Sequence, residues 1–166
     1  MAIANNERHE DDPVIRRLGE RVVRVDDRSL SPILSSGFPF LVGRLDWTKV
    51  PDASFRPAPP ERKHGANLGP ESLDTRSYAQ QVSAFFNECM LKIGASDSWV
   101  AYVGDNTEPE YKVRLDSVGE LMDEVSDVPE HKYIFALDAS WCFMWDFEDE
   151  LYFGRRPSSG KRIGRP

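Results

Sequence analysis

Aromatic and β-branched residues alternate with polar ones most clearly in the C-terminal third of the chain. Residues 132–154 read KYIFALDASWCFMWDFEDELYFG, which is three short apolar runs separated by two polar turns. This pattern predicts an antiparallel meander. Because successive side chains alternate across a strand, the middle run divides between two faces. One face receives Trp141, Phe143, Trp145 and Phe147, and the other receives Cys142, Met144, Asp146 and Glu148. So large an aromatic row implies that another element covers it.

Helical spacing of apolar positions predicts the elements that supply this cover. Residues 77–93 carry a wide apolar stripe at i, i+4, i+7 spacing, and Gly94 follows as a stop signal. A shorter helix is expected between Ser117 and Pro129. Near the N-terminus, Asp12 and Pro13 predict a helix start, with a possible strand at its end near residues 22–25. Further strands are predicted at 40–45, 99–103 and 111–115.

The order of elements from residue 77 onward is α-β-β-α-β-β-β, which predicts an α+β fold. We expect a mostly antiparallel sheet of about five strands with helices packed on one face. The chain then divides into four parts. These are an N-terminal helix and irregular subdomain (1–50), a Pro-rich loop (51–76), the α+β core (77–154) and a basic, disordered tail (155–166).

Charge is distributed unevenly along the 166 residues, whose net charge is −7. Residues 105–150 hold 14 acidic against three basic side chains, whereas the first 104 residues are nearly balanced and the last 12 carry five bases and no acid. An acidic region repels nucleic acid and attracts basic proteins. The alternative is a solvated surface that keeps the protein soluble.

Several classes of protein are disfavoured by what the sequence lacks. It has no run of 18 apolar residues and no basic N-terminus followed by an apolar stretch, so we expect a soluble, cytoplasmic protein without a membrane partner. Cys89 and Cys142 lie in apolar patterns and are expected to be buried, reduced thiols. We expect a monomer or weak dimer.

Motifs for catalysis are also missing. No glycine-rich phosphate loop, CxxC or HExxH motif is present, and the three histidines are scattered. We therefore predict neither an enzyme nor a bound cofactor or metal. A Cys-His-Asp set drawn from Cys89 or Cys142 with His131 and Asp138 is disfavoured, because apolar neighbours raise a thiol's pKa.

Two carboxylates leave an alternative open. Asp146 and Glu148 are expected on one strand face, about 7 Å apart by strand rise. This spacing suits acid/base chemistry in a small hydrolase, or a hard cation such as Ca²⁺. A third interpretation is a rigid acidic strand end and turn that recognises basic side chains.

The ending D-x-S-W-C-F-M-W-D-F-E-D-E-L-Y-F-G (138–154) resembles some immunity proteins of bacterial polymorphic-toxin and contact-dependent inhibition systems. The resemblance spans residues 133–154, where a Trp-bearing strand leads through an acidic turn into a short aromatic strand. It implies a non-enzymatic protein that binds and blocks a cognate toxin domain, often a basic nuclease. Charge and expected exposure, rather than any family motif, select the candidate partner-binding residues. They are Asp123, Glu124, Asp127, Glu130, Asp146, Glu148, Asp149 and Glu150.

Overall fold

A computed structural model describes residues 11–60, 75–105 and 108–158. Its centre is a seven-stranded antiparallel sheet in the order β1-β6-β5-β7-β8-β9-β4. The strands are β1 (Val22–Val25), β4 (Ser54–Arg56), β5 (Trp99–Gly104), β6 (Glu110–Arg114), β7 (Lys132–Ala136), β8 (Trp141–Trp145) and β9 (Leu151–Arg155). The α+β class is confirmed, but the sheet has seven strands where about five were predicted. The two additional strands, β1 and β4, come from the N-terminal part of the chain and pair with β6 and β9 at the two edges.

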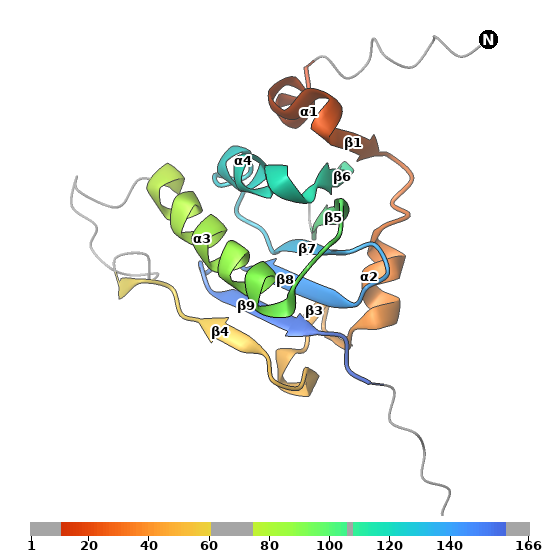
Figure 1. Ribbon diagram of the computed structural model, residues 1–166, viewed down its shortest axis with the longest axis vertical. Helices are drawn as coiled ribbons and strands as arrows, with labels where there is room; N and C mark the ends of the chain where they lie inside the picture. Colours follow the sequence, from red (N-terminus) through yellow and green to blue (C-terminus); the bar gives the residue numbers. More distant parts are fainter. Residues whose placement is uncertain (1–10, 61–74, 106–107, 159–166) are drawn as a thin grey trace, which may run out of the picture.

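One face of the sheet lies under three helices. They are α1 (Pro13–Leu18), α3 (Thr75–Ile93) and α4 (Val118–Glu124), and Figure 1 shows α3 crossing in front of β8 and β9. The stripe predicted for 77–93 faces inward, since Val82 and Phe86 of α3 pack with Phe143 and Trp145 of β8 in one buried cluster. The rings of Phe86 and Phe143 meet edge to face, with centroids 5.3 Å apart. The aromatic row is therefore a core, as its size required.

The opposite face is also covered, so the prediction that helices pack on one face only is wrong. Helix α2 (Ser31–Gly37) and the small hairpin of β2 (Phe40–Leu41) and β3 (Arg44–Leu45) lie over it, followed by a single 3₁₀ turn at Trp47–Lys49. Leu34 and Leu45 pack there against Tyr133, Phe135 and Met144. Residues of 29–50 that read as irregular thus form a second apolar layer. A strand that is buried on both faces needs such a layer.

Strand β8 ends earlier than the alternating pattern predicted. Trp141, Phe143 and Trp145 lie on the face covered by α3, but Phe147 is 46% exposed and leaves the row. The ladder stops at Trp145 because Asp146 Oδ1 accepts hydrogen bonds from the backbone N–H groups of Glu148 and Glu150, both at 2.9 Å. These bonds close a tight turn into β9. A side chain that satisfies backbone groups in this way competes with continuation of the strand.

The predicted N-terminal helix is confirmed in detail. Asp12 Oδ1 accepts from the N–H groups of Val14 and Ile15, at 2.9 and 3.2 Å, and Pro13 occupies the first helical position. The predicted strand at its end is β1. The residues between 61 and 74, most of the predicted Pro-rich loop, and the tail beyond 158 lie outside the described residues.

Candidate functional site

The sheet topology brings one end of every neighbouring strand together. The pairing registers join Val25 to Glu110, Gly104 to Lys132, Lys132 to Trp145, and Trp145 to Leu151. The loops that leave these positions, residues 26–29, 105–109, 125–131 and 146–150, therefore lie at the same end of the sheet. We call them the acidic end. As far as they are described, they contain the carboxylates of Asp26, Asp27, Asp105, Glu108, Asp127, Glu130, Asp146, Glu148, Asp149 and Glu150.

Few cations balance these carboxylates. In the described part of the same loops the basic side chains are Arg28 and His131. Arg28 Nε lies 2.8 Å from Glu108 Oε1 in an exposed ion pair. His131 is buried, and its Nε2 lies 3.9 Å from Asp105 Oδ2. Within these loops ten carboxylates therefore stand against one arginine, while Arg24 of β1 lies 2.6 Å from Asp26 and the buried Lys132 lies beneath them, so the acidic end keeps a net negative charge.

The other end of the sheet is more evenly charged. Its described loops and strand termini carry Glu20, Asp52, Asp97, Asp116 and Asp138 alongside Arg21, Arg114, Arg155 and Arg156. Counted in the same way, the strand termini of the acidic end add Glu110, Arg56 and Lys132 to its ten loop carboxylates and Arg28. Eight of the 14 acidic side chains of residues 105–150 thus lie in the loops of the acidic end, whereas Asp116 and Asp138 lie at the other end and three belong to α4. A concentrated field of one sign is what steers the association of a charged partner.

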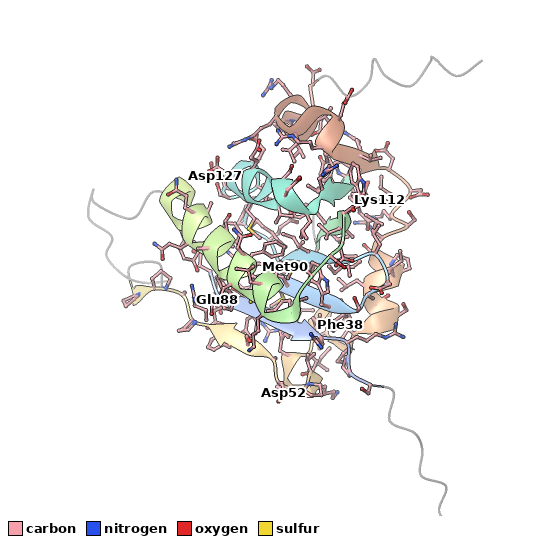
Figure 2. The ribbon with its side chains drawn as sticks, in the orientation of Figure 1. Phe38, Asp52, Glu88, Met90, Lys112 and Asp127 are labelled. Carbon is pink, nitrogen blue, oxygen red and sulfur yellow. The ribbon has the colours of Figure 1, made fainter. Side chains whose placement is uncertain are left out.

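The eight predicted partner-binding residues differ in how far they reach solvent. Asp127, beyond the end of α4 (Figure 2), and Glu148 are exposed, and Asp149 and Glu150 are half-buried. Glu130 and Asp146 are each only 2% exposed, so the expectation that they are surface carboxylates is wrong. Glu130 fits closely above Gly104, where a Cβ would lie 2.2 Å from its Oε1.

Asp123 and Glu124 have a different environment from the rest. Both belong to α4 and form ion pairs with Arg17 of α1, the Glu124 pair at 3.1 Å. Their side chains are 20% and 24% exposed. They join the two helices, and a docking partner would have to compete with Arg17 for them.

The β8–β9 turn is held by its own acidic side chains. Besides the two bonds to Asp146, Trp145 Nε1 donates to Asp149 Oδ1 at 2.9 Å and the Tyr152 hydroxyl donates to Glu150 Oε2 at 2.6 Å. Burial raises the pKa of Asp146, although the two backbone N–H groups oppose the shift. One oxygen from each of Asp146, Glu148 and Glu150 lies within 4.8 Å of the others, a spacing that allows a cation but does not establish one.

Beneath the acidic end, β7 begins with a buried lysine. Lys132 is 4% exposed, and its Nζ donates to the carbonyl oxygens of Val128, at 2.5 Å, and Glu130, at 3.4 Å. The ammonium lies over the Trp145 ring, 4.5 Å from the centroid. Desolvation lowers its pKa to about 8, while the surrounding carboxylates of Glu130, Asp149, Asp105 and Asp146 act in the opposite direction. This lysine stabilises the loop before β7 through its two hydrogen bonds, and because it is buried it is not available to a partner.

Sequence reasoning missed the part of the acidic end that comes from β1 and β5. Asp26, Asp27, Asp105 and Glu108 follow directly after those two strands. The sequence did contain a signal for these residues, since acidic side chains follow two of the predicted strands. Using that signal would have required knowing which strands are neighbours in the sheet.

The Cys-His-Asp set is not assembled. Cys89 belongs to α3 and packs on one face of the sheet, while Cys142 is buried on the other face. Asp138 lies in the β7–β8 turn, at the end of the sheet opposite His131. Both thiols are free, and burial raises their pKa, that of Cys89 to about 11.

Comparison with protein-family models, curated proteins and solved structures finds no significant match to the chain. Among the described residues, no helix is both long and apolar enough to cross a membrane. The function is therefore argued from the geometry of the acidic end itself.

Proposed function

We propose that the chain is a non-enzymatic binding module that neutralises a basic protein through its acidic end, as an immunity protein blocks a toxin domain. The observation that carries the proposal is the gathering of carboxylates from four loops at one end of the sheet, where Arg28 is the single permanently charged base in the described loop residues. The resemblance of residues 133–154 to immunity proteins agrees with this role.

The rigidity of the acidic end favours binding over a purely solubilising role. The β8–β9 turn is fixed by Asp146, and the segment after β1 is fixed by Glu110, whose carboxylate accepts from the backbone N–H groups of Leu30 and Ser31 at 2.8 and 3.1 Å. Charges held on a fixed framework lose little conformational entropy when a partner docks. A surface that only keeps a protein in solution has no need of such support.

The test starts with a tagged chain used to isolate partners from its native cells at low and at moderate salt. We expect a stoichiometric basic protein whose activity is inhibited and whose association slows as salt rises, because screening shortens the reach of the field. Glu148→Lys and Asp127→Lys should each lower the association rate several-fold, on the order of 10-fold together.

Glu20→Lys is the matched control, because Glu20 is exposed at the opposite end of the sheet and the charge change is identical. Asp149 and Glu150 are less suitable for reversal, since their side chains hold the turn. The proposal fails if no basic partner is retained at either salt concentration, or if Glu20→Lys slows association as much as Glu148→Lys.

The second candidate function is a small hydrolase that uses Asp146 and Glu148. The raised pKa of Asp146 favours it, since a general acid must hold its proton near neutral pH. However, Asp146 is committed to two backbone hydrogen bonds, and four cavities of 420 to 680 Å³ are lined by other residues. Hydrolysis of a substrate by the wild type that is lost in Glu148→Gln, with stability unchanged, would favour this candidate over the first.

A further inference from the structure

Exposed apolar side chains gather beside the acidic end. Eight large apolar side chains are exposed in the described part of the chain, and four of them belong to the β2–β3 hairpin or the β8–β9 turn. We call these four the apolar patch: Phe40, Leu41, Val42 and Phe147. The other four lie on separate elements, as Val23, Phe55, Leu91 and Leu137. Single exposed apolar residues are ordinary, whereas a group of them marks an interaction site.

Packing places the hairpin next to the acidic loops. Phe40 and Gly43 line a cavity of about 470 Å³ together with Asp105, which begins the loop after β5. Leu41 and Val42 lie between those two hairpin residues in the sequence, and their side chains are 58% and 96% exposed. The hairpin tip therefore presents apolar surface to solvent at the border of the acidic end.

Phe147 reaches the same face of the sheet from the β8–β9 turn. Its ring meets the buried ring of His131 edge to face, with centroids 5.0 Å apart. The His131 ring lies 6.4 Å from that of Tyr133, which lies 6.1 Å from that of Phe40. The two exposed phenylalanines thus stand at the ends of one run of neighbouring rings, the middle two of which are buried. Glu148 is exposed directly after Phe147, so charged and apolar surface are contiguous in this turn.

The sequence of the hairpin tip is unfavourable for the turn that it forms. Leu41 pairs with Arg44, so Val42 and Gly43 are the two loop residues, with φ of +50° and +82°. Two-residue loops with both φ values positive favour Asn-Gly or Asp-Gly, because a β-branched residue fits the left-handed region poorly. An exposed valine in this position supports neither the turn nor the core. Strained residues of this kind concentrate at functional segments, which points to a contact outside the chain.

The charge around the apolar patch restricts what can cover it. The nearby bases are Arg28, which is paired with Glu108, and Arg44 of β3, whereas the loops of the acidic end hold ten carboxylates. A second copy that docked through the same end would bring two surfaces of like charge together, and an anionic lipid surface would be repelled in the same way. A basic protein meets no such repulsion.

We propose that the apolar patch is the core of the docking surface and that the acidic end is its charged rim. The occupant is a basic partner protein that carries apolar side chains surrounded by lysine or arginine. This inference rests on the proposed function and names the part of the surface that holds the partner once charge has brought it near. An apolar core within a polar rim is the usual anatomy of a protein interface, and the core residues carry most of the binding energy.

The test uses the full chain and a probe peptide, so it does not depend on finding the partner. The probe is a fluorophore-labelled amphipathic peptide of leucine and lysine in a helical pattern, and anisotropy reports its binding. Two matched peptides replace every leucine by serine or every lysine by glutamate. We expect saturable binding of the leucine–lysine peptide, binding of the serine–lysine peptide that is about fivefold weaker or more, and no binding of the leucine–glutamate peptide.

Substitutions in the hairpin separate the apolar patch from the rest of the surface. Leu41→Ser and Val42→Asn should each weaken binding of the leucine–lysine peptide about threefold or more, because each removes apolar area from the contact. Val42→Asn should also keep or raise the midpoint of urea unfolding, since asparagine suits this turn, so its weaker binding is not a folding defect. Leu91→Ser is the matched control, because Leu91 is 84% exposed on α3 and lies outside the apolar patch.

Four results would overturn the proposal. They are no saturable binding of the leucine–lysine peptide, equal binding of the serine–lysine peptide, a loss in Leu91→Ser as large as in Leu41→Ser, and a dimer in sedimentation that Val42→Asn abolishes. The last result would make a second copy the occupant. Equal binding of the serine–lysine peptide would leave the proposed function standing, because that function is tested by charge reversal at Glu148 and Asp127 and not by the apolar side chains.

Discussion

The buried Lys132 leads to a quantitative prediction about stability and pH. Its ammonium group is paired with backbone carbonyl oxygens and a Trp145 ring, but with no carboxylate in a described ion pair below 4 Å. Desolvation is the largest influence on it and lowers the pKa from 10.5 to about 8. Holding this lysine protonated inside the fold therefore costs free energy at neutral pH.

The sign follows from proton linkage. Between pH 8 and 10.5 the folded chain has released the Lys132 proton, whereas the unfolded chain still binds it. Because at this residue the unfolded state binds more protons in this window, the contribution of Lys132 to the free energy of unfolding rises with pH. The full shift corresponds to about 3 kcal/mol, and the part between pH 7.5 and 9.5 to about 2 kcal/mol.

Lys132→Met tests this reasoning, since methionine retains an apolar stem over Trp145 and has no proton to lose. Urea denaturation at intervals from pH 7.5 to 9.5 gives the free energy of unfolding for both proteins. We expect the wild type to gain about 2 kcal/mol relative to the variant across this range. The exposed Lys92 supplies the control, because Lys92→Met should leave the pH dependence of the wild type unchanged.

Parallel curves for wild type and Lys132→Met would refute the argument, because they would mean that Lys132 titrates alike in both states. The upper limit of pH 9.5 matters for this comparison. Burial raises the pKa of Tyr102, Tyr111 and Tyr133 above the value of 10 that holds in the unfolded chain. Above pH 10 the unfolded chain therefore loses these protons first, and the free energy of unfolding falls. Cys89 and Cys142, whose pKa values burial also raises, lower stability within this range as the unfolded thiols ionise. Because wild type and variant share both thiols, the difference between their curves reports on the lysine.

Three further predictions concern stability and reactivity. Gly104→Ala should lower the free energy of unfolding measured in urea by about 1–3 kcal/mol, because its Cβ would overlap the buried Glu130 carboxyl. Gly119→Ala is the control and should not destabilise the fold, because its Cβ would meet Ser83 Oγ at an ordinary distance of 3.6 Å. Asp146→Ala should cost about 1–3 kcal/mol by leaving two turn N–H groups without their acceptor, and Asp146→Asn should cost less because its amide oxygen can replace Oδ1; equal losses would contradict this role. Cys89 and Cys142 should react with a thiol reagent such as DTNB only in denaturant, since both are buried with raised pKa; fast labelling of the native chain would show that a thiol is accessible.

Periodicity was enough to predict the parts of the fold that carry their own pattern. The stripe of α3 and the three runs of the meander bury large apolar side chains at fixed spacing, and both are where the pattern indicated. The pattern was insufficient for α2 and the β2–β3 hairpin. Prolines and glycines interrupt their apolar residues, and these short elements are stabilised by packing on the sheet rather than by local preference.

The edge strands of the sheet were harder to predict for a related reason. β4 contributes three residues, and its ladder with β9 joins positions about 100 apart in sequence, so no local signal marks it. The extent of the acidic end could not be predicted from the sequence either. Asp26 and Asp105 lie at the same end of the sheet as Glu148 because the strand order is β1-β6-β5-β7-β8, and that order is not visible in the sequence. Net charge along the sequence pointed to residues 105–150, and the topology determines which of their carboxylates share one end of the sheet.

The buried and the exposed carboxylates of the acidic end have complementary roles. Glu110, Glu130 and Asp146 lie below the surface, where Glu110 and Asp146 satisfy backbone N–H groups and Glu130 occupies the space left by Gly104. Asp127 and Glu148 project from the loops these residues fix. Substituting the first group should alter stability before binding, and substituting the second should alter binding with stability unchanged. Under the proposed function, a partner that meets charges already held in place would lose less entropy on docking, so the interior carboxylates would raise its affinity without contacting it.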